Sequence, residues 1–206
     1  MSLVNLAARQ RMLSQRMVMQ ALRAARGEAA QLVAARQSLT LFTDSQRRLE
    51  STPRELEPDA AHHIEATYRG PRGVARRIAD FVLAMQSTLE AMEHGGRRSD
   101  DALAQLIEQA DPVLEALNTA TSAFDHIARL KADAVMRELT SIVESIQTVA
   151  REAKIVSFNA QVMAARAGTH GREFAVVADV LSRITAEINE LSVKALALAA
   201  LSRQGR

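Results

Sequence analysis

The chain has 206 residues, of which 48% are hydrophobic, 24% are charged and only 3% are aromatic. Because strands favour aromatic and β-branched residues whereas alanine is the best helix former, the 38 alanines exclude an all-β fold and disfavour a doubly wound α/β fold. The absence of cysteine excludes disulfides and thiol chemistry, and the net charge is only +2.

Breaker residues divide the first half of the chain into helices. We expect helices over residues 3–26, 28–50, 73–93 and 100–110. The segment 53–71 is predicted to be a loop with one helical turn around residues 60–68, because it contains three prolines and a glycine. His94-Gly95-Gly96 should end the third helix, and Ser99-Asp100-Asp101 should cap the fourth.

The second half contains a much longer helix. Nothing breaks the chain between Val113 and Ala167, and a helix of about 55 residues would be about 80 Å long at 1.5 Å per residue. Asp111-Pro112 fits the start of this helix, or a kink in it. Such a length indicates a coiled coil.

Apolar residues along this helix recur in steps of three and four, as in a coiled coil. The series is Ala128, Ala132, Val135, Leu139, Ile142, Ile146, Val149, Ala153, Val156, Ala160, Met163 and Ala167. After a turn at Gly168–Gly171 it resumes as Phe174, Val177, Leu181, Ile184, Ile188, Leu191, Ala195 and Leu198. We predict an antiparallel hairpin in which Ala167 faces Phe174 and Val143 faces Leu198.

The turn resembles a known signalling module. Residues 155–185, IVSFNAQVMAARAGTHGREFAVVADVLSRIT, resemble the hairpin tip of methyl-accepting chemotaxis proteins. The resemblance implies a signal-transduction protein whose tip binds the histidine kinase CheA and the adaptor CheW and associates with further copies. The tip residues that it assigns to partner binding are Asn159, Arg166, Gly168, Gly171, Arg172, Phe174 and Val177.

Several tip positions differ from the family pattern. Met163, Thr169 and Val180 stand where the family has glutamate, and Glu173 and Ser182 replace a glycine and an arginine. The family's methylation sites lie on longer arms than this chain has, so we expect no methyl-accepting activity. A hairpin kept only for dimerisation is the alternative.

The first helix carries a second resemblance. Residues 5–17, NLAARQRMLSQRM, resemble the opening helix of PilJ-type sensor domains and the nitrate-binding stretch of nitrate/nitrite sensor kinases. The resemblance places Arg11-Met12 on the Arg-Met pair that reads the anion across a dimer interface, and Ser14 and Arg16 also match. It implies a PilJ-type helical sensor domain over residues 1–127.

A helical wheel singles out Arg11 independently. Arg11 lies among apolar side chains, with Ser14 and Gln15 beside it, whereas Arg9, Arg16 and Arg23 form a separate stripe that we expect to be solvated. A guanidinium on an apolar face needs a bound oxyanion or a carboxylate. Both stay open: an anion site of Arg11, Ser14, Gln15 and Arg16, or an ion pair with Asp80 or Asp125.

We therefore predict an all-α protein, with a four-helix sensor bundle over residues 1–127 continuing into an antiparallel coiled-coil hairpin over 128–206. No catalytic, metal or cofactor motif is present, so we expect no enzyme. We expect a cytoplasmic homodimer or higher oligomer without a membrane span or nucleic-acid partner. The alternative functions are a helical dimerisation scaffold derived from a chemoreceptor and, with less support, a nucleic-acid binder that uses the basic first helix.

Overall fold

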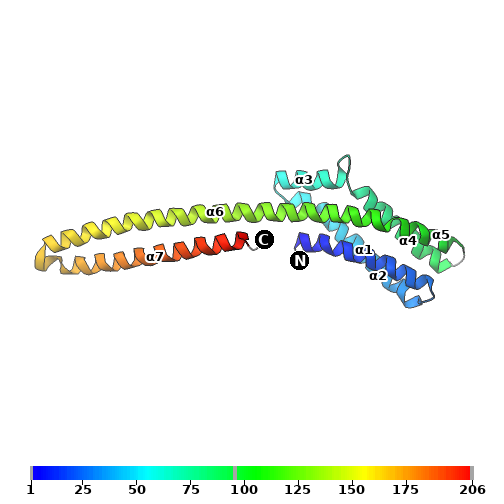
Figure 1. Cartoon of the computed structure of the whole chain (residues 1–206), viewed down its shortest axis with the longest axis horizontal. Coiled ribbons are helices and arrows are strands. Elements are labelled where there is room, and N and C mark those ends of the chain that lie inside the picture. The colour runs from blue at the N-terminus through cyan, green and yellow to red at the C-terminus, as the bar shows by residue number, and fades with distance from the viewer. Residues whose placement is uncertain (1, 95–96, 205–206) are drawn as a thin grey trace. The chain divides into compact units, whose positions relative to one another are not determined.

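The computed structural model describes residues 2–94 and 97–204, and within these ranges it contains helices and no strand (Figure 1). The prediction of an all-α fold is confirmed. The elements are α1 (Leu3–Ala25), α2 (Ala29–Ser51), η1 (Thr52–Glu55), α3 (Pro58–Arg69), α4 (Ala75–His94), α5 (Arg97–Glu108), α6 (Ala110–Arg166), η2 (Gly168–Gly171) and α7 (Arg172–Gln204).

The predicted helix ends are close to the observed ones except around two segments. The expected loop at 53–71 contains the 12-residue helix α3, because Pro58 occupies its first turn and Ile64 and Tyr68, one turn apart, are buried in the core. Helix α5 begins at Arg97, so Ser99 lies inside it and is not its cap. Gly95-Gly96, the predicted break, lies outside the described residues.

The long helix is confirmed as α6, which has 57 residues. It begins at Ala110, so Pro112 lies in its first turn, where the missing backbone N–H removes no helical hydrogen bond. The chain forms two compact units, residues 1–129 and 130–206, and α6 contributes to both.

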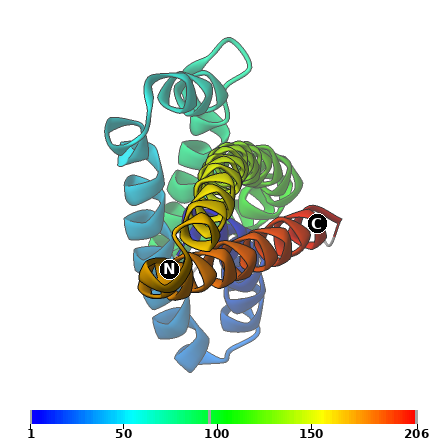
Figure 2. The same cartoon turned by 90° about the vertical axis from the view of Figure 1, so that its left-hand side faces the viewer.

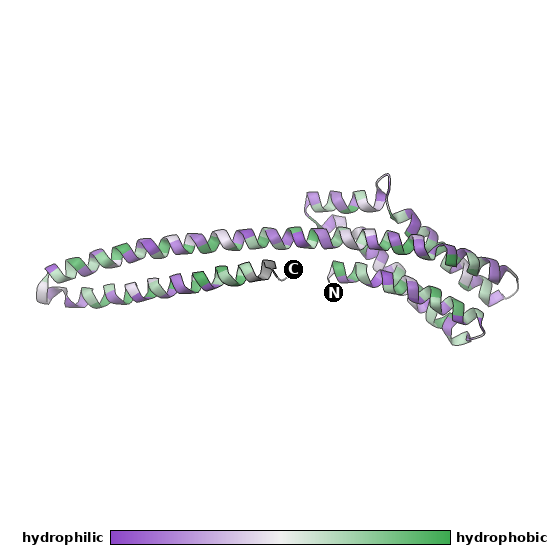
Figure 3. Cartoon of the chain, viewed as in Figure 1, coloured by the Kyte–Doolittle hydropathy of each residue, from purple (hydrophilic) through white to green (hydrophobic). Residues whose placement is uncertain are grey.

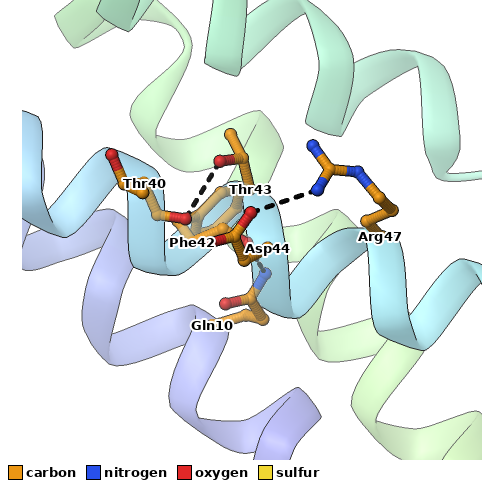
Figure 4. Close-up of polar contacts among 6 residues, drawn as sticks. All are labelled: Gln10, Thr40, Phe42, Thr43, Asp44 and Arg47. Atoms are coloured by element: carbon orange, nitrogen blue, oxygen red, sulfur yellow. Dashed lines mark hydrogen bonds and ion pairs between the residues drawn. The ribbon is translucent and has the colours of Figure 1, made fainter.

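The unit of residues 1–129 is built around one hydrophobic core. Long segments of α1, α2, α4 and α6 contribute to it, and α3 and α5 add Ile64 and Leu106. Phe42 and Phe81 meet edge to face, with ring centroids 5.9 Å apart, where α2 and α4 lie side by side (Figure 2). Polar side chains also enter this core. The Nε2 of Gln10, a fully buried residue, donates to the Phe42 carbonyl oxygen at 3.0 Å (Figure 4).

The unit of residues 130–206 is the predicted antiparallel hairpin, and its fully buried positions recur every seven residues. These residues are Val143, Ala150, Ser157, Ala164, Gly171, Ala178, Thr185, Ser192 and Ala199. Most are small, which lets the backbones of α6 and α7 approach closely. We call this series the small-residue seam.

The observed pairing of the two arms differs from the predicted one. The Ser157 hydroxyl donates to the Ala178 carbonyl, which does not fit the register that pairs Ala167 with Phe174 and Val143 with Leu198. Gly171 packs directly on the Ala164 backbone, so the turn is tighter than the expected pairing of Ala167 with Phe174 allows. The predicted apolar series is therefore not the most buried line of contact between the two arms, and its members Ala153, Leu181 and Ile188 are only half-buried.

We predict that Gly171→Ala destabilises the hairpin. A Cβ built at Gly171 would lie 2.0 Å from the Ala164 carbonyl oxygen, so α6 and α7 must move apart. Overpacking of this kind costs about 1–3 kcal/mol in the free energy of unfolding, which urea denaturation measures.

The matched control is Gly168→Asn. Gly168 has a φ of +59°, which asparagine tolerates, and a Cβ there meets nothing within 4 Å. The control should retain most of the stability that Gly171→Ala loses. Equal stability of the two variants would contradict close contact at Gly171.

Candidate functional site

The predicted apolar series lies largely on the surface of the hairpin. We call its large exposed members between Val135 and Leu191 the apolar face. They are Val135, Leu139, Ile142, Ile146, Val149, Val156 and Met163 on α6, and Phe174, Val177, Ile184 and Leu191 on α7. Hydrophobic residues recur along both arms in Figure 3.

Both arms contribute to one groove on this face. Its volume is about 400 Å³, and its lining includes Ile142, Ile146 and Val149 from α6 and Ile184 and Ile188 from α7. An apolar surface that follows a heptad repeat along two adjacent helices is typical of a helix-packing interface. The face can therefore accept further helices by knobs-into-holes packing.

The predicted tip residues lie around the turn. Gly171 is buried, whereas Asn159, Arg166, Gly168, Arg172, Phe174 and Val177 are exposed. Phe174 is 72% exposed and Met163 also 72%. The tip thus presents apolar and cationic groups together, a combination that suits protein partners.

Sequence reasoning missed part of this tip surface. Phe158 and Val176 are both 65% exposed, although neither belongs to the predicted apolar series. The signal available in the sequence was that these large apolar residues stand outside the heptad repeat, where a solvent-facing residue is usually polar.

Arg11 has a polar partner inside its own unit. Its Nη1 donates to Asn118 Oδ1 of α6 at 2.9 Å. The predicted carboxylate partners are wrong, because Asp80 lies 3.9 Å from Arg76 and Asp125 pairs with Arg129 at 2.9 Å. Since Asn118 carries no charge, the positive charge of Arg11 is not neutralised by this contact.

The other predicted anion ligands are only partly gathered near Arg11. Ser14 and Gln15 line a groove of about 380 Å³ together with Val18, Met19 and residues of α6. The Ser14 hydroxyl donates to the Arg11 carbonyl at 2.8 Å, and Arg16 is exposed. The arrangement places one cation and two polar side chains on neighbouring turns of α1.

The basic stripe of α1 is not uniformly solvated. The half-buried Arg9 donates from Nη2 to Ser45 Oγ at 2.9 Å, so it helps to join α1 to α2. Arg23 forms a hydrogen-bonded ion pair with Glu28, which lowers the pKa of the Glu28 carboxyl. Arg16 and Arg23 are both exposed, as the stripe prediction expected, and Arg9 is the exception.

Among the described residues there is neither a membrane-spanning helix nor a cluster of three or more metal ligands. No helix there is long and apolar enough to cross a bilayer. No group of three or more His, Cys, Asp or Glu side chains there is arranged to hold a metal ion.

The signalling domain of methyl-accepting chemotaxis proteins matches residues 83–196 of this chain. The matched segment includes most of α4, all of α5 and α6, and most of α7. It therefore contains the apolar face and the tip, and it extends into the unit of residues 1–129.

Individual relatives are chemotaxis and biofilm proteins. The chain is 34% identical to the biofilm dispersion protein BdlA of Pseudomonas aeruginosa over 110 residues, 53% of this chain and 24% of that protein. It is 29% identical to the methyl-accepting chemotaxis protein PcaY of Pseudomonas putida over 152 residues, 73% of this chain and 26% of PcaY. The match to McpA of Bacillus subtilis is 23% identical and covers 77% of this chain and 23% of McpA.

The chain thus spans about a quarter of the length of these curated relatives. No solved structure matches it.

Proposed function

Because the chain belongs to the methyl-accepting chemotaxis protein family through its signalling domain, we propose that it is a signal-transduction protein of the cytoplasm. In this proposal the unit of residues 1–129 is a PilJ-type sensor that binds a small oxyanion such as nitrate. The hairpin relays the change to CheA and CheW. The observation that carries the proposal is the apolar face, which follows a heptad repeat on both arms and stays largely exposed in the single chain.

The occupant that best suits this face is a second copy of the hairpin. The small-residue seam already joins α6 to α7, so two hairpins that bury their apolar faces against each other would form a four-helix bundle. In a two-fold symmetric dimer the apolar face of each copy packs against that of the other, so one interface buries both faces. We therefore propose a homodimer.

In this proposal a single continuous helix carries the effect of ligand binding to the tip of the hairpin. Helix α6 contains Arg11's partner Asn118 and continues without a break to Arg166 at the tip. A ligand that changes the contact between α1 and α6 would bias the position of α6. Such coupling requires that the ligand bind two arrangements of α6 with different affinity.

The anion proposal rests on the chemistry of Arg11. Arg11 is half-buried as a residue, and its guanidinium meets a neutral amide oxygen in an exposed hydrogen bond, so an oxyanion that reaches it would supply the missing negative charge. Ser14 and Gln15 lie on the adjacent groove. The alternative function, a scaffold that dimerises without sensing, shares the hairpin but not this site.

We predict that Ile146→Asn weakens dimerisation at least about tenfold. Burying an isoleucine side chain is worth about 1.5–3 kcal/mol, and about 1.4 kcal/mol corresponds to a factor of ten in Kd. Sedimentation equilibrium of the full chain measures the Kd. The control is Ile155→Asn, since Ile155 is 61% exposed on the same helix but lies off the apolar face. A monomeric wild type, or equal loss in both variants, would contradict a dimer through this face.

We predict that the chain alters the autophosphorylation rate of CheA in the presence of CheW, and that Asn159→Ala combined with Arg172→Ala abolishes the change. Both side chains are exposed at the tip, so truncation removes polar contacts without disturbing the seam. Arg183→Ala, which lies farther along α7, is the control. A rate that is the same with and without the wild-type chain would favour the scaffold alternative.

We predict that nitrate raises the melting temperature of the wild type and not that of Arg11→Gln. A ligand at about 100 times its Kd stabilises a protein by about 2.7 kcal/mol. Chloride at equal ionic strength controls for screening, and Arg26→Gln, at the C-terminal cap of α1, controls for the loss of one arginine. If nitrate, nitrite and acetate each change the melting temperature of the wild type and of Arg11→Gln equally, Arg11 is not an anion-binding residue.

A further inference from the structure

Two histidines from helices far apart in the sequence meet on the surface of the unit of residues 1–129. The ring centroids of His63 on α3 and His126 on α6 lie 5.3 Å apart, and the ring planes are inclined by 45°. Both residues are exposed, and neither ring makes a hydrogen bond or ion pair within the described chain. The two imidazoles are therefore close together and accessible from solvent.

The packing of α3 against α6 holds both histidines in place. Ile64, the neighbour of His63, is fully buried. Phe124, two residues before His126, is also buried. A second ring contact between the same helices joins Tyr68 to Phe124, with centroids 6.4 Å apart. Because helices fixed by a core position side chains more precisely than loops do, the core sets the distance between the two rings.

Two imidazoles at this separation suit one divalent transition-metal ion. Imidazole nitrogen is a preferred ligand of Zn²⁺, Ni²⁺ and Cu²⁺. With metal–nitrogen bonds of about 2.0–2.1 Å in tetrahedral geometry, two imidazoles that share an ion have ring centroids about 5 Å apart. The observed 5.3 Å is close to this spacing. Because both rings are exposed, they can turn about their Cβ–Cγ bonds to direct one nitrogen each at a common ion.

From this contact we propose that His63 and His126 bind a divalent transition-metal ion that bridges α3 and α6. The carboxylate next to His126 belongs to Asp125, which pairs with Arg129 at 2.9 Å, so the two imidazoles are the protein ligands and water completes the coordination. No spacing in the sequence indicates this pair, because its members lie on different helices. The site goes beyond the proposed signalling function, since neither Arg11 nor the hairpin takes part in it.

A bound ion would stabilise the folded unit. The two ligands come together only when α3 packs against α6, so the unfolded chain presents them separately. A ligand that binds only the folded state raises the melting temperature. Helix α3 would gain most, because Ile64 and Tyr68 are its only buried residues.

Calorimetric titration of the untagged full chain with Zn²⁺ and with Ni²⁺ tests the proposal. Mg²⁺, which prefers oxygen ligands, is the negative control. We expect saturable binding of one Zn²⁺ or Ni²⁺ ion per chain and a rise in melting temperature. His63→Ala and His126→Ala should each weaken binding at least about tenfold and remove this rise. Both side chains are exposed, so the melting temperatures of the variants in EDTA should equal that of the wild type.

The matched control is His62→Ala. His62 is exposed on the same helix as His63 and takes no part in the ring contact, so this variant should bind Zn²⁺ like the wild type. Equal weakening in His62→Ala and His63→Ala, or undiminished binding by His63→Ala, would mean adventitious binding to surface histidines only and would overturn the site. The absence of saturable Zn²⁺ and Ni²⁺ binding to the wild type would overturn it as well.

Discussion

The close contact between Gly171 and the Ala164 backbone is the constraint on which the hairpin depends. A side chain at Gly171 would collide with the Ala164 carbonyl oxygen, so the turn is possible in this form only with glycine. The contact determines the register, that is, which residue of α6 lies opposite which residue of α7. Every buried residue of the small-residue seam then follows at seven-residue intervals from Gly171. The pairing of the arms is thus determined at the turn.

This constraint also determines where the apolar residues lie. Small and polar residues such as Ala150, Ser157 and Thr185 occupy the contact between the arms, because only they allow the backbones to come so close. The larger Val, Ile and Leu side chains of the heptad series consequently lie beside that contact. Their exposure in a single chain is what makes a second hairpin the natural occupant of the apolar face.

The unit of residues 1–129 differs in how its core is built. Its helices bury large side chains such as Met17, Phe42 and Phe81, but polar contacts such as that of Gln10 with the Phe42 carbonyl lie among them. Arg11, for which an apolar face predicted a charged partner, meets the neutral Asn118. Burial raises the pKa of the Tyr68 hydroxyl, so this phenol stays neutral. The unit therefore leaves the positive charge of Arg11 without an anionic partner.

The sequence by itself determined the helical fold, the long helix α6, the turn at Gly168–Gly171 and the heptad repeat, because these depend on local propensity and periodicity. The sequence could not determine whether the apolar face or the small-residue seam forms the main contact between the arms. A heptad repeat indicates an apolar surface but not which helix packs against it. Sequence reasoning also missed α3, whose stability comes from burying Ile64 and Tyr68 in a core formed by distant helices. Only the tertiary structure decided these features and brought His63 and His126 together, because side chains far apart in sequence meet only after the helices have packed.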